Sequence, residues 1–161
     1  MSKKLEALEE IRTLKHKYWR LMDQFIEDQI GDVFSEEAVC DFGDFGYIKG
    51  RANIVEFFRS QVYPMFDMMV HMGHNPEIQL TSETTANGTW LYECYQLTKE
   101  PVTGIWLTGW YDDRYVVEDG VWKIEYSTGT YYFNTDMEEQ WAKRRFVPYP
   151  PERDVIEEPV K

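Results

Sequence analysis

The chain has 161 residues, of which 43% are hydrophobic, and a formal net charge of -12. This length and apolar content suit one compact domain with a sizeable core. The excess of acidic groups repels nucleic acid and anionic membranes, so neither is expected as a partner. The first residues lead into a charged helical pattern and no run of about 18 apolar residues follows, which predicts a cytoplasmic protein. Cys40 and Cys94 form no metal or redox motif and are expected to be small buried residues.

The first element is predicted to be an amphipathic helix from residue 5 to about residue 25, because apolar residues recur there at spacings of three and four. Its buried stripe consists of Leu8, Ile11, Leu14, Lys15, Tyr18, Leu21, Met22 and Phe25. Asp23 lies roughly 140° around an ideal helix from Tyr18. Both side chains can therefore reach one pocket only if the helix bends or frays near Gln24.

Shorter elements follow this helix. Residues 27–34 and 51–62 are predicted helices, the second of which ends before Pro64 because proline cannot continue the helical ladder. A short strand is expected at residues 38–42, and residues 138–146 are expected to form a last short helix. The acidic tail at 148–161 contains several prolines and is predicted to extend from a domain that spans residues 1–147.

From Val70 onward the pattern is that of a sheet. Asn87-Gly88 and Asp119-Gly120 are dipeptides that suit two-residue type I′ turns. They predict one hairpin that joins 77–86 to 89–98 and another that joins 102–118 to 121–133. Helices followed by long antiparallel strands indicate an α+β fold, in which the helices cover one face of a curved sheet. Such a sheet closes into a cone, and its open end would be a pocket.

Two of the three histidines, His71 and His74, lie in one apolar segment with strand character. A neutral imidazole in an apolar pocket can accept a proton near pH 7 when an acidic group orients its other nitrogen. The plainer interpretation is a core histidine that donates to a backbone carbonyl. His74 is expected to point to the opposite face and to be structural. A zinc site is disfavoured, because Gly73 and Pro76 argue against a helix and no further ligands have a recognisable spacing.

Several segments together resemble the SnoaL-like branch of the NTF2-like superfamily. They are IRTLKHKYWRLMD at 11–23, HMGHNPEI at 71–78, SETTANG at 82–88 and DGVWK at 119–123, and the likeness covers nearly the whole chain. Within that branch the sequence resembles the bile acid 7α-dehydratases, and it is also similar to the lindane dehydrochlorinases and to scytalone dehydratase. The resemblance implies a cone whose curved antiparallel sheet wraps around the N-terminal helices. It also implies a lyase without a cofactor, commonly trimeric, that removes a proton and a leaving group from a hydrophobic ring.

With the resemblance, three residues are expected to be catalytic: His71 as the general base, Asp23 as the partner that holds its imidazole, and Tyr18 as a donor to the developing enolate. His71 matches the histidine shared by the dehydratases and dehydrochlorinases, Asp23 matches an acidic residue of the dehydrochlorinases, and Tyr18 matches the dehydratase tyrosine. Two positions depart from the family pattern. Cys94 stands where the bile acid enzymes have a catalytic aspartate, and Tyr132 falls about where they have an arginine.

The strand register places Trp90, Tyr92 and Cys94 on the same face as His71, together with Gln96. This face is expected to be a pocket wall that binds substrate, with Tyr132 as a further contact. Trp90 and Tyr92 either stack on a ring-shaped ligand or pack as ordinary sheet aromatics. Cys94 has no activating neighbour in the sequence and is interpreted as a small wall residue.

Two functions of different classes fit these features. The first is a dehydratase that eliminates water from a hydroxylated, carbonyl-bearing ring, such as a steroid or bile-acid derivative, without metal or nucleotide. The second is a non-catalytic small-molecule-binding module on the same fold. A dehydrohalogenase or isomerase is the intermediate case. Trp106, Trp110, Tyr111 and Tyr115 lie on both faces of one strand, so the outer face should remain aromatic and be covered in a homotrimer.

Overall fold

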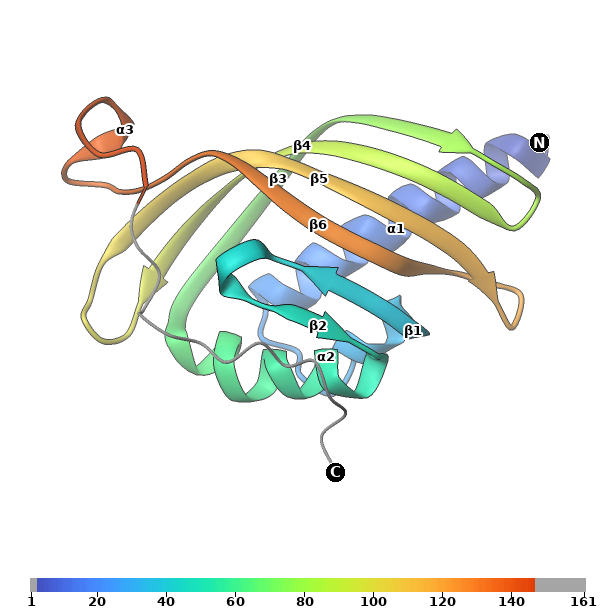
Figure 1. Cartoon of the computed structure of the whole chain (residues 1–161), viewed down its shortest axis with the longest axis horizontal. Coiled ribbons are helices and arrows are strands. Elements are labelled where there is room, and N and C mark those ends of the chain that lie inside the picture. The colour runs from blue at the N-terminus through green and yellow to red at the C-terminus, as the bar shows by residue number, and fades with distance from the viewer. Residues whose placement is uncertain (1–2, 147–161) are drawn as a thin grey trace.

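Figure 1 shows the computed structural model of the chain, in which residues 3–146 are described. The elements in chain order are α1 (Lys3–Asp23), η1 (Ile30–Val33), β1 (Phe34–Asp41), η2 (Gly43–Phe45), β2 (Tyr47–Lys49), α2 (Arg51–Phe57), η3 (Phe58–Val62), η4 (Tyr63–Met65), β3 (Phe66–Leu80), β4 (Thr85–Thr98), β5 (Gly104–Glu118), β6 (Val121–Asp136) and α3 (Gln140–Lys143). The tail predicted at 148–161 lies outside the described residues. Within them no helix is long and apolar enough to span a membrane.

The strands form one six-stranded sheet in the order β2-β1-β6-β5-β4-β3. The long strands β3 to β6 are antiparallel neighbours, whereas β1 runs parallel to β6. The sheet is curved and does not close, and α1 lies along its concave side, with α2 beside β1 and β2 (Figure 1). The predicted α+β class and the curved sheet around the N-terminal helix are therefore confirmed, whereas the expected closure of the sheet into a cone is not seen, because β2 and β3 remain at its two edges.

One of the two predicted turns is confirmed and the other is wrong. Asp119 and Gly120 join β5 to β6 with φ angles of 52° and 77°, as a type I′ turn requires. Asn87 and Gly88, by contrast, lie inside β4, opposite Gln79 and Ile78 of β3. The strand pairing continues through the Asn-Gly dipeptide, because β3 ends at Leu80 and the chain already reverses at residues 81–84.

The actual turn between β3 and β4 is built by hydroxyl groups. The Thr85 side-chain oxygen lies 2.6 Å from that of Thr81 and 2.8 Å from that of Ser82, and the Ser82 oxygen also accepts the backbone N–H of Thr84 at 3.0 Å. These contacts fix the loop through side chains, as Ser and Thr do in many turns. Nothing in this loop has the sequence signature of a two-residue hairpin.

The helix α1 packs closely on the sheet because β3 has a glycine at the contact. The ring of Trp19 lies on Gly73, where a Cβ would come within 2.1 Å of ring carbon Cζ3. Trp19 also packs edge-on against Trp90 of β4, with ring centroids 5.6 Å apart. A side chain at position 73 would push the helix away from the sheet.

A buried ion pair lies in the core between α1 and β5. The Lys15 ammonium is 2.8 Å from an Asp113 carboxylate oxygen, and both side chains are 0% exposed. The Asp113 carboxylate also accepts the Tyr115 hydroxyl at 2.6 Å and the Ser127 hydroxyl at 2.7 Å. The Lys15 nitrogen lies 3.7 Å from the centre of the Tyr111 ring, so a carboxylate and an aromatic face replace water around the cation.

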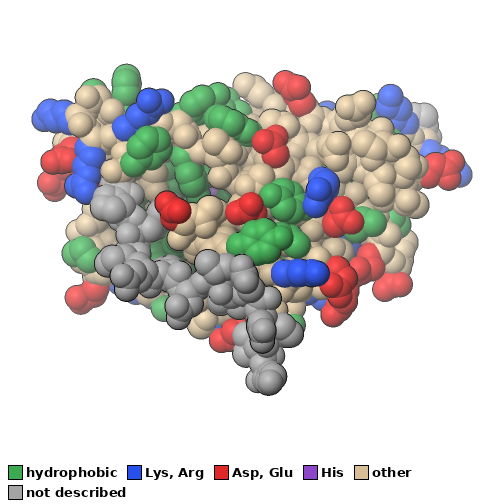
Figure 2. All heavy atoms as spheres, viewed as in Figure 1, with side chains coloured by type: hydrophobic (Ala, Val, Ile, Leu, Met, Phe, Trp, Pro, Cys, Tyr) green, Lys and Arg blue, Asp and Glu red, His purple; other side chains and the backbone are tan. Residues whose placement is uncertain are grey.

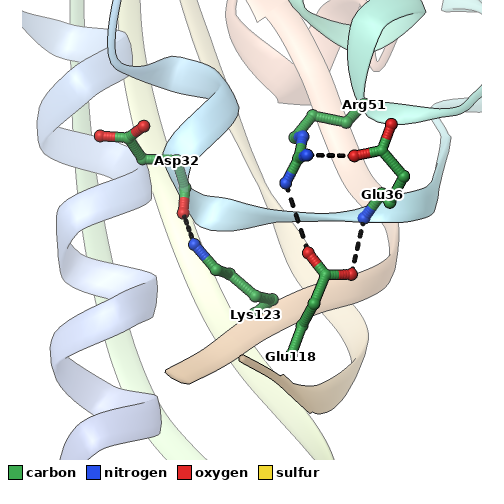
Figure 3. A network of polar contacts seen from close by, with 5 residues as sticks. All are labelled: Asp32, Glu36, Arg51, Glu118 and Lys123. Atoms are coloured by element: carbon green, nitrogen blue, oxygen red, sulfur yellow. Dashed lines mark hydrogen bonds and ion pairs between the residues drawn. The ribbon is translucent and has the colours of Figure 1, made fainter. Parts of the chain in front are cut away.

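Charged residues at the surface connect the ends of several elements (Figure 3). Arg51 at the start of α2 bonds to both Glu36 of β1 and Glu118 of β5, and the Glu36 backbone N–H donates to Glu118 at 2.9 Å. The Lys123 ammonium donates to the backbone carbonyl of Asp32. These contacts tie β1 and η1 to the β5–β6 turn. The visible face of the molecule otherwise mixes acidic, basic and apolar side chains (Figure 2).

Candidate functional site

An apolar cavity lies between α1, the segment from η2 to η4 and the concave face of the sheet. It is lined by Tyr18, Met22, Phe42, Phe45, Phe58, Val62, Phe66, Met69, His71, Tyr92, Gln96, Leu107, Tyr111 and Tyr131. The centres of water-sized molecules have about 50 Å³ of free space inside it. A cavity that is mostly apolar, with a few polar groups turned into it, is the usual form of a small-molecule site.

A second hollow, about 520 Å³, lies on the outside of the molecule. It runs between α1 and the β5–β6 turn, and charged side chains such as Glu9, Glu10 and Lys17 line it. Charged walls that face water give little reason for an apolar ligand to leave solvent. The interior cavity, which contains His71, is therefore the better candidate for a binding site.

Asp23 reaches His71 because α1 ends at Asp23. The chain leaves the helix through Phe25, whose φ is 53°, and the Ile26 backbone N–H donates to the Leu21 carbonyl at 2.9 Å. This helix end supplies the change of direction that was expected near Gln24. The Asp23 carboxylate consequently turns back toward β3.

The structure brings Asp23 and His71 together through two hydrogen bonds. His71 Nδ1 lies 2.6 Å from Asp23 Oδ1, and the His71 backbone N–H donates to Asp23 Oδ2 at 2.9 Å. One carboxylate therefore holds both the ring and the backbone of His71. With Nδ1–H donated to Asp23, the neutral imidazole keeps Nε2 as its basic nitrogen.

The surroundings of His71 shift its protonation. Its side chain is 5% exposed. Burial lowers the pKa of His71, but the Cys94 sulfur and the Asp23 carboxylate raise it by more, and the resulting pKa is about 9. Asp23 thus stabilises an imidazolium inside an apolar cavity, as a partner of a general base must do.

Tyrosine rings form much of the cavity wall beside this pair. Tyr18 is buried and packs edge-on against Tyr111 with ring centroids 6.4 Å apart, while Tyr111 lies 4.4 Å from Tyr92. The Tyr92 ring stacks near His71 at 6.3 Å. Burial raises the pKa of Tyr18 and of Tyr111 well above the ordinary value. Both phenols are therefore neutral at ordinary pH and keep a proton that they can donate.

Of the four predicted substrate contacts, the structure places Tyr92 in the cavity lining and the other three outside it. Trp90 lies deeper in the core, where its indole N–H donates to the Tyr115 hydroxyl at 2.9 Å. Cys94 is directly opposite His71 in the strand register, with Leu107 on its other side. Its short side chain is fully buried between these two larger neighbours and does not reach the cavity.

Tyr132 is displaced by one residue from its predicted place. A bulge between β5 and β6 pairs Thr108 with Phe133 but Gly109 with Tyr131, so Tyr132 is the extra residue. Tyr131 lines the cavity instead, while Tyr132 is 48% exposed and packs on Trp110 at 5.0 Å. Gly109 makes the bulge possible, because a Cβ there would meet the Thr130 carbonyl oxygen at 2.0 Å. A glycine inside a strand pattern was the available signal for this bulge.

His74 lies away from the cavity, as expected for a structural residue on the other face. Its side chain is 46% exposed, and its Nε2 is 3.6 Å from Glu93 Oε1. Across residues 3–146, no group of three or more His, Cys, Asp and Glu side chains is placed to hold a metal ion.

Comparison with known proteins agrees with this architecture. The chain is 22% identical over 116 residues to hexachlorocyclohexane dehydrochlorinase 1 of Sphingobium indicum, which covers 72% of this chain and 75% of that protein. It is also 26% identical over 115 residues to an uncharacterized protein of Mycobacterium tuberculosis. That match covers 71% of this chain and 78% of the other protein.

Two solved structures share the fold. Hexachlorocyclohexane dehydrochlorinase LinA-type3 of Novosphingobium barchaimii superposes with a TM-score of 0.78 at 22% identity, covering 91% of this chain and 98% of that one. A provisionally named scytalone dehydratase of Novosphingobium aromaticivorans gives a TM-score of 0.74 at 21% identity, covering 83% and 89%. The family model of the SnoaL-like domain matches residues 3–128. The chain therefore belongs to the SnoaL-like domain family of the NTF2-like superfamily.

Proposed function

We propose that this protein is a cofactor-independent lyase that eliminates water from a small, hydroxylated, carbonyl-bearing hydrophobic ring. The observation that carries this proposal is the hydrogen bond between Asp23 and His71, whose side chain is 5% exposed and lines an apolar cavity. Structural neighbours named as a dehydrochlorinase and a scytalone dehydratase support a lyase-type activity. A buried, carboxylate-bound histidine that faces a cavity suits proton abstraction better than passive binding.

In the proposed mechanism, His71 Nε2 removes a proton from the carbon next to the substrate carbonyl. The electron pair moves onto the carbonyl oxygen, and the neutral Tyr18 hydroxyl donates to the enolate that forms. Asp23 stabilises the imidazolium. The enolate then reforms its carbonyl and expels the hydroxyl from the neighbouring carbon. This hydroxyl takes the proton back from His71 and leaves as water. The ring gains one double bond conjugated with its carbonyl, and no net oxidation occurs.

The size of the cavity favours one or two rings over a four-ring steroid. Its free space of about 50 Å³ is small beside the roughly 300–1,000 Å³ of sites that hold drug-sized ligands. A steroid or bile-acid derivative would require side chains of the cavity wall to move outward. A single substituted ring needs less rearrangement.

The proposal is tested by incubating the protein with one- and two-ring β-hydroxy ketones. The expected product is a conjugated enone, detected by its new ultraviolet absorbance and by the loss of one water in mass spectrometry. If these ketones bind tightly and none is converted at any pH at which the protein is folded, the binding-module alternative is the better function.

The pH dependence of catalysis follows from the raised pKa of His71. Only the neutral imidazole accepts a proton, so with a pKa of about 9 the value of kcat/KM should rise about tenfold per pH unit and level off above that pKa. Asp23→Asn removes one of the two groups that raise the pKa of His71, so its profile should level off at a lower pH. A wild-type profile that is flat from about pH 7 upward would contradict the assignment of His71 as the base.

The same pKa predicts the opposite trend for stability. The folded-state pKa of His71 is raised above its ordinary value, so its contribution is fully present below the ordinary pKa of 6.5 and is lost as pH rises through about 9. Urea unfolding across this window measures the loss. Activity and stability should therefore change in opposite directions with pH.

We also infer a homotrimer, because aromatic groups remain on the outer face of the sheet. Trp106 and Trp110 point outward from β5, where Trp110 packs on Tyr132. Val70 and Met68 of β3 are 41% and 43% exposed. Light scattering at micromolar concentration should give a trimer mass, and Tyr132→Glu should shift it toward the monomer while Tyr132→Phe leaves it unchanged. A wild-type monomer would overturn the inference.

A further inference from the structure

Gln96 is a polar side chain in the apolar cavity that the proposed mechanism does not use. It lies on β4, two residues beyond Cys94, which is the direct partner of His71. Alternate residues of a strand share a face, and diagonal neighbours on adjacent strands are about 7–8 Å apart. Gln96 is therefore the diagonal neighbour of His71, and both line the cavity.

The side-chain oxygen of Gln96 lacks a hydrogen-bond partner in the part of the chain that the structure describes. Its strand neighbours in the register are Met69 and Ile105, whose side chains offer no hydrogen-bond donor. Its Oε1 is buried and has no hydrogen-bond partner among residues 3–146. A buried acceptor without a donor is costly, whereas a methionine or leucine of similar size would avoid that cost. The position thus favours a ligand that brings a donor.

We propose that the Gln96 amide binds the hydroxyl of the substrate and selects hydroxylated rings over halogenated rings of the same shape. The inference rests on the proposed function, since it concerns the same cavity and its substrate. A hydroxyl donates to a side-chain oxygen and accepts from an amide N–H, whereas a carbon-bound halogen has no hydrogen to donate. A chlorinated ring would leave the Gln96 oxygen unpaired.

The orientation of this contact fits elimination. A hydroxyl held at Gln96 places the neighbouring carbons of a small ring toward His71, which is one diagonal step away on the adjacent strand. The amide is neutral and does not compete with the imidazole for the proton. Gln96 is thus a specificity-determining residue, distinct from the base.

Binding of two unreactive probes tests the inference separately from catalysis. Cyclohexanol and chlorocyclohexane share one ring, and neither has a carbonyl that acidifies a proton. Ligand-observed NMR should show that the wild-type protein binds the alcohol about 10- to 100-fold more tightly, the cost of one unpaired buried acceptor. Gln96→Met should reduce this ratio to about one by weakening the alcohol alone.

Three comparisons make the result decisive. Gln79→Met makes the same chemical change at an exposed position of β3 and should keep the wild-type ratio. Gln96→Glu retains a side-chain oxygen and should keep a preference for the alcohol. Because Gln96→Met removes an unpaired polar group, it should unfold at the same or a higher temperature than wild type.

The two proposals fail in different ways. An equal affinity of wild type for both probes, or an unchanged ratio in Gln96→Met, overturns the role of Gln96 even if β-hydroxy ketones are converted. A ratio that collapses in Gln96→Met while no ketone is converted supports hydroxyl recognition and overturns the lyase.

Discussion

His71→Ala should abolish measurable elimination, lowering kcat roughly 10²–10⁴-fold, the usual contribution of a positioned general base. The imidazole is the base in the proposed mechanism, and the Asp23 carboxylate holds it at 2.6 Å. Asp23→Asn should retain part of the rate, because the imidazole remains but loses the charge that stabilises its protonated form. Initial rates of enone formation, measured at the pH optimum of each variant, give these values.

His74→Ala is the matched control for this prediction. It makes the same substitution on the same strand, at a side chain that is 46% exposed and away from the cavity, so kcat should be unchanged. The kcat of Tyr18→Phe should lie between those of His71→Ala and His74→Ala. Loss of the phenol that donates to the enolate should lower it about 10²–10³-fold. If His71→Ala keeps the wild-type rate on a confirmed substrate, His71 is not the base.

The sequence alone was sufficient for the fold class and for the approach of Asp23 to His71. The apolar stripe of the helix and the two-residue alternation of the strands both arise because one face of each element is buried. Hydrophobic periodicity therefore predicts the elements directly. The helix end at Asp23 could be stated only as a requirement, since no glycine or proline marks it. Phe25 adopts a positive φ of 53°, a conformation that its side chain does not favour and that tertiary contacts impose.

The errors came from local signals that long strands override. Asn87-Gly88 suits a tight turn, but the pairing of β3 with β4 continues through it, and Gly88 instead leaves room for the Tyr115 ring, which would lie 2.9 Å from a Cβ. Tyr132 was misplaced by a single residue because of the bulge at Gly109. A one-residue shift moves a side chain to the opposite face of a sheet, so counting along a hairpin identified the neighbour of the residue that lines the cavity.

Lys15 is a position where the sequence predicted burial but did not identify the acidic residue that pairs with the buried ammonium. It lies on the apolar stripe of α1, and its carboxylate partner, Asp113, is 98 residues away on β5. Such a pair depends on the packing of the helix against the sheet. Removing one member of the pair should lower the free energy of unfolding substantially, because neither charge has contact with water.

Lys15→Met should lower the free energy of unfolding by about 3–5 kcal/mol, the usual cost of removing one member of a buried ion pair. The substitution keeps much of the apolar stem but leaves the Asp113 carboxylate buried with only the Tyr115 and Ser127 hydroxyls. Burial lowers the pKa of Lys15, and the Asp113 carboxylate opposes that shift. Urea unfolding with an unchanged m-value measures the loss.

The double variant Lys15→Met/Asp113→Asn distinguishes two contributions to the loss of stability: the lost attraction between the charges and the cost of leaving the Asp113 carboxylate buried without a counter-charge. An asparagine oxygen can still accept from Tyr115 and Ser127 but carries no charge, so the double variant should recover most of the stability lost in Lys15→Met. Lys17→Met is the surface control on the same helix; the Lys17 side chain is 34% exposed and lies 3.5 Å from Asp32, so it should cost less than about 1 kcal/mol. Equal losses in Lys15→Met and Lys17→Met would mean that the buried pair contributes nothing beyond a surface contact.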